Sequence, residues 1–111
     1  MGEVFRARDT RLDRTVAIKI LPKTLAGDPH FRERFDREAR AISHLTHPHI
    51  CTLYDVGEHD GTAFLVMELL DGETLTAHLE SGALPQAALT VAIEITSALD
   101  AAHHAASCTA I

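Results

Sequence analysis

Residues 15–21 are T-V-A-I-K-I-L, a run of apolar and β-branched side chains with one lysine inside it. This composition predicts a β-strand, and Pro22 ends it because proline cannot donate to a sheet ladder. Since strand side chains alternate, Lys19 shares a face with Ala17 and Leu21. Both faces are largely apolar, which indicates a partly covered ammonium group. An edge-strand lysine with its head in water is the alternative interpretation.

The next predicted element is a helix, and it too carries a charged group, a carboxylate, at a position expected to be covered. Asp28 is a helix N-cap and Pro29 fits the first helical position. An apolar stripe follows at helical spacing, formed by Phe31, Phe35, Ala39, Ile42 and Leu45. His47 and Pro48 should end the helix. Glu38 falls on the stripe, and a buried carboxylate without a partner is costly, so we expect it to pair with Lys19.

The other predicted elements complete an α+β order. Residues 4–8 alternate between apolar and polar and should form a hairpin with residues 15–21 across a polar turn at 9–13. Two more strands are predicted at 50–56 and 62–69, joined by a turn at 57–61. A short helix at 73–81 and a long apolar helix at 85–106 follow. A small sheet with one helix against it and then a helical section is an α+β fold.

Composition and charge exclude several classes of function. The chain has a net charge of −6 and therefore lacks the basic surface expected of a nucleic-acid binder. Cys51 and Cys108 are far apart, which predicts free thiols in a reducing compartment. The histidines at 44, 47 and 49 lack the cysteine or carboxylate that would complete a metal site. No signal peptide or membrane-spanning run is recognisable, so we expect a cytoplasmic chain without membrane contact.

In several motifs the chain resembles the small (N-terminal) lobe of bacterial serine/threonine protein kinases. V-A-I-K at 16–19 matches the lysine motif of the third strand, and Glu38 follows at the usual separation of the helix C glutamate. G-E-V at 2–4 matches the end of the Gly-rich loop, and H-P-H-I at 47–50 resembles the connection after helix C. F-L-V-M-E-L-L at 64–70 resembles the fifth strand and hinge, with Met67 as gatekeeper.

The resemblance implies an antiparallel small-lobe sheet that lacks its first strand, with helix C and the hinge, over about residues 1–70. Helices D and E of an otherwise missing large lobe (C-lobe) would occupy 71–106. Lys19 would hold the α- and β-phosphates of ATP, and Glu38 would hold Lys19. These two residues are the implied catalytic pair.

The resemblance also implies a binding role for each residue around the nucleotide. Val4 and Ala17 would sandwich the adenine ring, and backbone groups of Glu68 and Leu70 would bond its edge. Glu73 would reach the ribose, and Gly2 would let the backbone approach the phosphates. The implied reaction transfers the γ-phosphate of ATP, with Mg²⁺, to Ser or Thr hydroxyls of protein substrates.

The sequence departs from the family by lacking the H-R-D catalytic loop, its downstream asparagine and the D-F-G metal-binding aspartate. We therefore expect no phosphoryl transfer from these 111 residues alone. The alternative function is a pseudokinase-like module that binds nucleotide or a partner without catalysis. A small unrelated α+β domain would be favoured if Lys19 and Glu38 lay far apart.

Residues 106–111 are A-S-C-T-A-I, where the family usually has G-I-V-H-R-D. With the codons GCA TCG TGC ACC GCG ATC, one G inserted after the Ala105 codon encodes G-I-V-H-R-D. We hypothesise that a one-nucleotide deletion truncated a full kinase and left an out-of-frame tail at 107–111. Genomic DNA that cannot encode G-I-V-H-R-D in the neighbouring frame would contradict this hypothesis.

Overall fold

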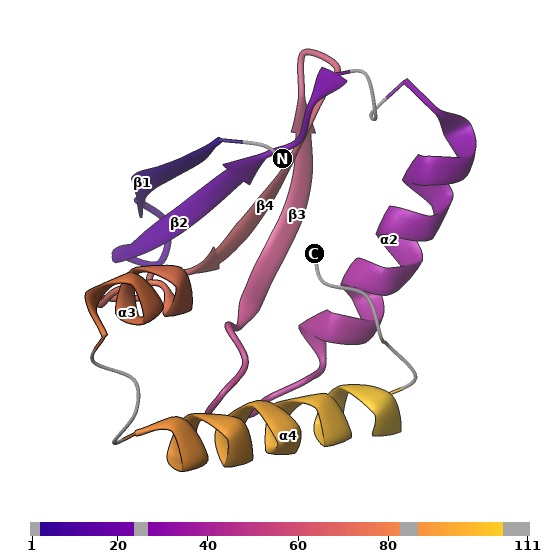
Figure 1. Cartoon of the computed structure of the whole chain (residues 1–111). Coiled ribbons are helices and arrows are strands. Elements are labelled where there is room, and N and C mark those ends of the chain that lie inside the picture. The colour runs from indigo at the N-terminus through magenta and orange to yellow at the C-terminus, as the bar shows by residue number, and fades with distance from the viewer. Residues whose placement is uncertain (1–2, 24–26, 83–86, 106–111) are drawn as a thin grey trace.

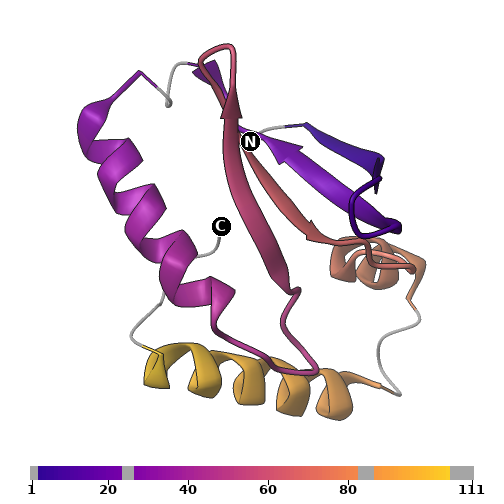
Figure 2. The same cartoon turned by 180° about the vertical axis from the view of Figure 1, so that it is seen from behind.

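The computed structural model describes residues 3–23, 27–82 and 87–105 and shows a twisted sheet with helices on one side and beneath it (Figure 1). The sheet is four-stranded and antiparallel, in the order β1-β2-β4-β3. Its strands are β1 Val4–Asp9, β2 Arg14–Ile20, β3 Leu53–His59 and β4 Thr62–Glu68. Helix α2 runs along one face of the sheet, and α4 crosses below it (Figure 2). The predicted α+β class is confirmed.

The second hairpin turns later than the sequence predicted. Asp60 and Gly61 both have positive φ, 49° and 75°, which is the two-residue turn that matches the twist of paired strands. Gly57 stays inside β3 opposite Phe64, so the turn predicted at 57–61 is confined to Asp60 and Gly61. The predicted strand at 50–56 likewise begins only at Leu53.

Helix α2 spans Pro29–Ser43 and starts as predicted. The Asp28 carboxylate accepts a hydrogen bond from the His30 N–H at 3.0 Å. The helix ends at Ser43, ahead of the expected stop at His47 and Pro48, and Leu45 therefore lies outside it. A backbone hydrogen bond from the Leu45 N–H to the Ile42 carbonyl, at 2.9 Å, closes the last turn.

Two further helices follow the sheet. Helix α3 spans Leu75–Ser81, where the Thr74 side chain accepts from the Ala77 N–H, and α4 spans Ala88–His104. Both lie inside the predicted helical ranges. Within the three described ranges, no helix combines the length and apolar character needed to cross a bilayer. The Gly2 assignment and the proposed tail at 107–111 lie outside the described residues.

The core lies between α2 and the sheet. Ala39 of α2, Leu53 of β3 and Leu65 of β4 are buried together, with exposed fractions of 1%, 7% and 0%. Phe35, Ile42, Val56 and Met67 pack around them. Because Leu65 packs with Ala39 of α2, the side of the sheet that carries Leu65 is the side that faces the helix.

Candidate functional site

Lys19 lies on the helix-facing side of the sheet. In the register of β2 with β4 it stands opposite Leu65, and Ala17 stands opposite Met67. Directly opposed residues of antiparallel strands share a face, so the predicted face of Lys19 is the one that carries the core. Val4 of β1 stands opposite Lys19 on that same face.

Val4 and Ala17 therefore lie side by side on the helix-facing side of the sheet. They are diagonal neighbours across the β1–β2 pair, since Ala17 is opposite Arg6. Two side chains on one sheet face can cover one side of an aromatic ring. The sandwich proposed from the sequence would need its second layer from another element.

Glu38 is mostly covered, but it is not bonded to Lys19. Its side chain is 20% exposed, and its ion-pair partner is Arg34, with Nε 3.9 Å from Oε1. Within the described residues, Lys19 and Glu38 do not come within the 4.0 Å of an ion pair. The predicted contact is thus absent in this structure.

The strand order explains this gap. Helix α2 makes its principal contact with β3, whereas Lys19 is on β2 and β4 lies between the two strands. Strands are about 4.8 Å apart, so β2 and β3 are separated by about 10 Å. The two residues still share a side of the sheet, because Ala39, the neighbour of Glu38, packs with Leu65, the register partner of Lys19.

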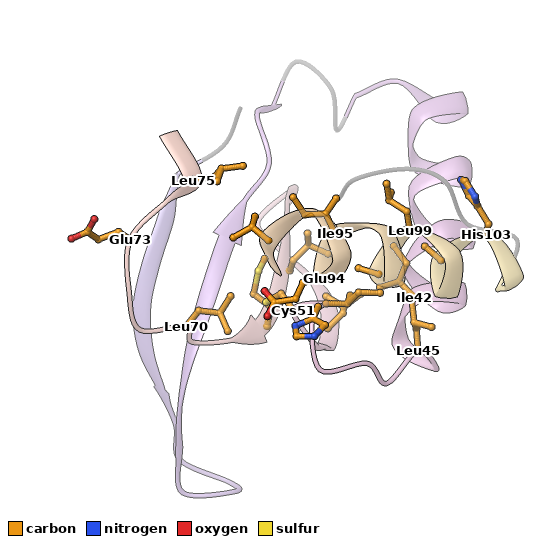
Figure 3. A pocket seen from close by; sticks show the side chains of 18 residues that line it. Ile42, Leu45, Cys51, Leu70, Glu73, Leu75, Glu94, Ile95, Leu99 and His103 are labelled. Carbon is orange, nitrogen blue, oxygen red and sulfur yellow. The ribbon is translucent and has the colours of Figure 1, made fainter. Parts of the chain in front are cut away.

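A hollow of about 930 Å³ borders this face between the sheet and α4 (Figure 3). Leu53, Leu65 and Met67 line it from the sheet, and Val91, Ile95 and Ala98 line it from α4. Leu70 and Glu73 also contribute to the lining. In Figure 3 the Glu73 carboxylate points away from the other labelled side chains.

Sequence reasoning identified Met67, Leu70 and Glu73 but missed most of this lining. The helical spacing of Val91, Ile95 and Ala98 marks one face of α4, and alternation along β4 pairs Leu65 with Met67. Those patterns indicate burial, but they do not tell a core from the wall of a hollow.

Glu68 ties the end of β4 to the chain that enters β3. Its N–H donates to the Thr52 carbonyl at 2.9 Å, and its carboxylate accepts from the Thr52 N–H at 3.2 Å. The Cys51 thiol donates to the Glu68 carbonyl at 3.5 Å. A carbonyl has two lone pairs, so this weak bond leaves an acceptor site for a further donor.

Cys51 is a poor candidate for a nucleophile. Burial, and secondarily the Glu68 carboxylate, raise the pKa of its thiol above the ordinary value of 9.0. Reactive cysteines need the opposite shift, because the thiolate is the nucleophile.

The described residues do not supply a complete ligand set for a metal ion. No group of three His, Cys, Asp or Glu side chains is placed to hold one within residues 3–23, 27–82 and 87–105. His47 and His49 lie with their ring centroids 5.6 Å apart.

Comparison with known proteins identifies the family. The protein kinase domain family matches residues 1–108. The serine/threonine-protein kinase PknE of Mycobacterium bovis is 45% identical over 107 residues, which cover 95% of this chain and 19% of PknE. PknH of Mycobacterium tuberculosis is 45% identical over 105 residues, covering 93% of this chain and 17% of PknH.

The crystal structure of the Mycobacterium tuberculosis PknI kinase domain matches with a TM-score of 0.82 at 34% identity. That match covers 94% of this chain and 44% of the PknI chain. This chain spans about a fifth of the length of PknE and less than half of the solved PknI domain. These matches agree with the position of Lys19 in β2 and with the presence of helix α2, which carries Glu38. The chain belongs to the protein kinase domain family.

Proposed function

We propose that this chain is the ATP-binding portion of a protein serine/threonine kinase. In the intact enzyme the γ-phosphoryl group of ATP would pass to Ser or Thr hydroxyls of protein substrates. The observation that carries the proposal is the gathering of Val4, Ala17 and Lys19 on one sheet face, beside a hollow bordered by Met67 and Leu70.

The chemistry available to this face is electrostatic. Phosphoryl transfer depends on positioning and on neutralising phosphate charge, and the Lys19 ammonium is a compact cation suited to both. Glu38 is the carboxylate on the facing helix that would orient Lys19 when the two meet. Bound Mg²⁺ neutralises charge between phosphate groups, but the described residues lack a ligand set for it.

We further propose that these 111 residues alone do not transfer phosphate, because they contain neither H-R-D nor D-F-G. A phosphorylation assay with labelled ATP and a generic basic protein substrate tests this. ATP-dependent phosphorylation that disappears in Lys19→Ala would refute it.

Nucleotide binding is tested by titrating a fluorescent ATP analogue into the 111-residue chain. Lys19→Ala should weaken binding about 10-fold or more, since a hydrogen bond to a charged group contributes roughly 1.5–3 kcal/mol. The matched control is Lys23→Ala, which removes an exposed lysine just beyond the same strand. Equal affinities of the two variants would contradict the proposal.

A stand-alone, non-catalytic module is the second candidate, and the exposed apolar surface of α4 distinguishes it from a portion of a larger kinase. Leu89, Ile93 and Leu99 have exposed fractions of 75%, 61% and 53%. Such apolar exposure favours association. Size-exclusion chromatography separates the candidates: a monodisperse monomer favours the stand-alone module, whereas concentration-dependent association favours a portion of a larger kinase.

A further inference from the structure

The pairing of Glu68 with Thr52 departs from a regular antiparallel ladder. In a regular hydrogen-bonded pair, two opposed residues exchange both of their backbone N–H···O bonds. The Glu68 N–H does donate to the Thr52 carbonyl, at 2.9 Å. The Thr52 N–H, however, donates to the Glu68 carboxylate oxygen Oε2, at 3.2 Å. The side chain of Glu68 thus takes the place of its own backbone carbonyl in the last pair of the ladder.

This exchange leaves the backbone carbonyl of Glu68 outside the ladder. Its partner in the structure is the Cys51 thiol, whose Sγ lies 3.5 Å from the oxygen. A thiol is a weak donor and a carbonyl oxygen has two lone pairs, so a stronger donor can still bind there. Glu68 lines a hollow of about 410 Å³, which shares Cys51 and Leu70 with the larger hollow beside Met67. A ligand can therefore approach this end of β4.

The position of Thr52 explains why a side chain is needed. Thr52 lies just before the first residue of β3, and the pairing of β3 with β4 is irregular between Leu53 and Asp55. Thr52 is half-buried, and a backbone N–H away from water needs an acceptor. Without the carboxylate, the acceptor that completes the regular pair is the backbone carbonyl of Glu68. That carbonyl would then be occupied.

We propose that the Glu68 side chain is a positioning residue that keeps its own backbone carbonyl free for the amino group of a bound adenine base. The inference rests on the proposed binding of ATP. The Glu68 N–H is engaged by Thr52, so this residue offers a nucleotide only an acceptor. The 6-amino group of adenine is a donor, whereas guanine carries an acceptor oxygen at the same place. The carboxylate therefore acts on base recognition through the carbonyl, without touching the base.

The first test needs no nucleotide. Scalar couplings transmitted through hydrogen bonds identify the acceptor of each amide in long-range ¹H–¹⁵N–¹³C spectra of the 111-residue chain. In the parent chain and in Glu68→Gln, the Thr52 amide should correlate with the side-chain carbon Cδ of residue 68. In Glu68→Ala it should correlate with the backbone carbonyl carbon of that residue. A parent chain in which the Thr52 amide already correlates with the backbone carbonyl of Glu68 would overturn the inference.

The second test compares ATP with purine riboside triphosphate, which lacks the 6-amino group, in calorimetric titrations. The parent chain and Glu68→Gln should prefer ATP by about 2- to 10-fold, the factor for one net hydrogen bond. Glu68→Ala should bind the two nucleotides with equal affinity, because only the contact with the amino group is lost. A merely structural role of Glu68 would instead weaken both nucleotides alike and leave the preference unchanged.

The matched control is Asp71→Ala, which removes an exposed carboxylate close to Glu68 in the chain. It should keep the preference of the parent. The inference would be overturned by a Glu68→Ala chain that keeps this preference, by a Glu68→Gln chain that loses it, or by a parent chain that binds both nucleotides equally. A chain that binds neither nucleotide would reject the proposed ATP binding and the adenine contact with it, whereas the first test decides the acceptor of the Thr52 N–H by itself.

Discussion

Replacing Gly57 with alanine tests how closely β3 and β4 pack. Gly57 stands opposite Phe64, and an added Cβ would lie 2.4 Å from Phe64 Cζ and 2.8 Å from Cε2. Carbon atoms in contact are normally about 3.5–4.0 Å apart, so the ring must leave its position. Overpacking of this kind costs about 1–3 kcal/mol.

Part of that cost is recovered by the backbone. Gly57 is not among the described glycines with positive φ, so alanine meets no backbone strain there. Alanine in a strand is favoured over glycine by about 0.5–1 kcal/mol, which leaves a net loss of up to about 2.5 kcal/mol.

Urea unfolding followed by far-ultraviolet circular dichroism measures this loss, since the chain has no tryptophan. The control is Phe64→Leu, which removes the ring. In that background Gly57→Ala should become neutral or stabilising, because the colliding atoms are gone. An equal change in the free energy of unfolding in both backgrounds would refute the packing explanation.

Three further changes test the fold. Leu65→Ala should lower the free energy of unfolding by about 2–5 kcal/mol in urea melts, because it opens a cavity beneath Ala39. Asp28→Ala should cost about 0.5–2 kcal/mol and reduce the helical dichroism, because the His30 N–H loses its cap. The hydrogen bond and charge of Arg32 hold the pKa of Glu58 below its ordinary 4.5. That pair therefore stabilises the fold fully above 4.5 and is lost as the pH falls through the lowered pKa, so Arg32→Gln should flatten the acid side of a stability–pH profile.

Local patterns in the sequence were sufficient to predict most elements and one face of the site. The β-branched run around Lys19 predicted β2 and its alternation, and Asp28 with Pro29 predicted the start of α2. These features depend on residues next to one another, whose backbone preferences act before any tertiary contact forms.

Features that depend on the third dimension were missed. The hollow beside Met67 needs α4 to cross below the sheet, and the bond of His47 to Ser97 joins residues far apart in the chain. The turn was misplaced for a local reason: Gly57 and Gly61 both resemble turn glycines, and only the position of Phe64 shows that Gly57 makes room for a ring.

The partner of Glu38 shows where the two kinds of information separate. Arg34 is four residues earlier on the same helix, so helix formation alone brings it within 3.9 Å. A helical ion pair of this spacing contributes only about 0.2–0.5 kcal/mol, and the order of acid after base is the weaker one. Lys19 is a cation in a less hydrated place, where a charge pair is stronger. Its pairing with Glu38 depends on the position of α2 relative to β4, the neighbour of β2. The sequence encodes the first pairing locally, whereas the second would require α2 to lie closer to β2 than it does in this structure.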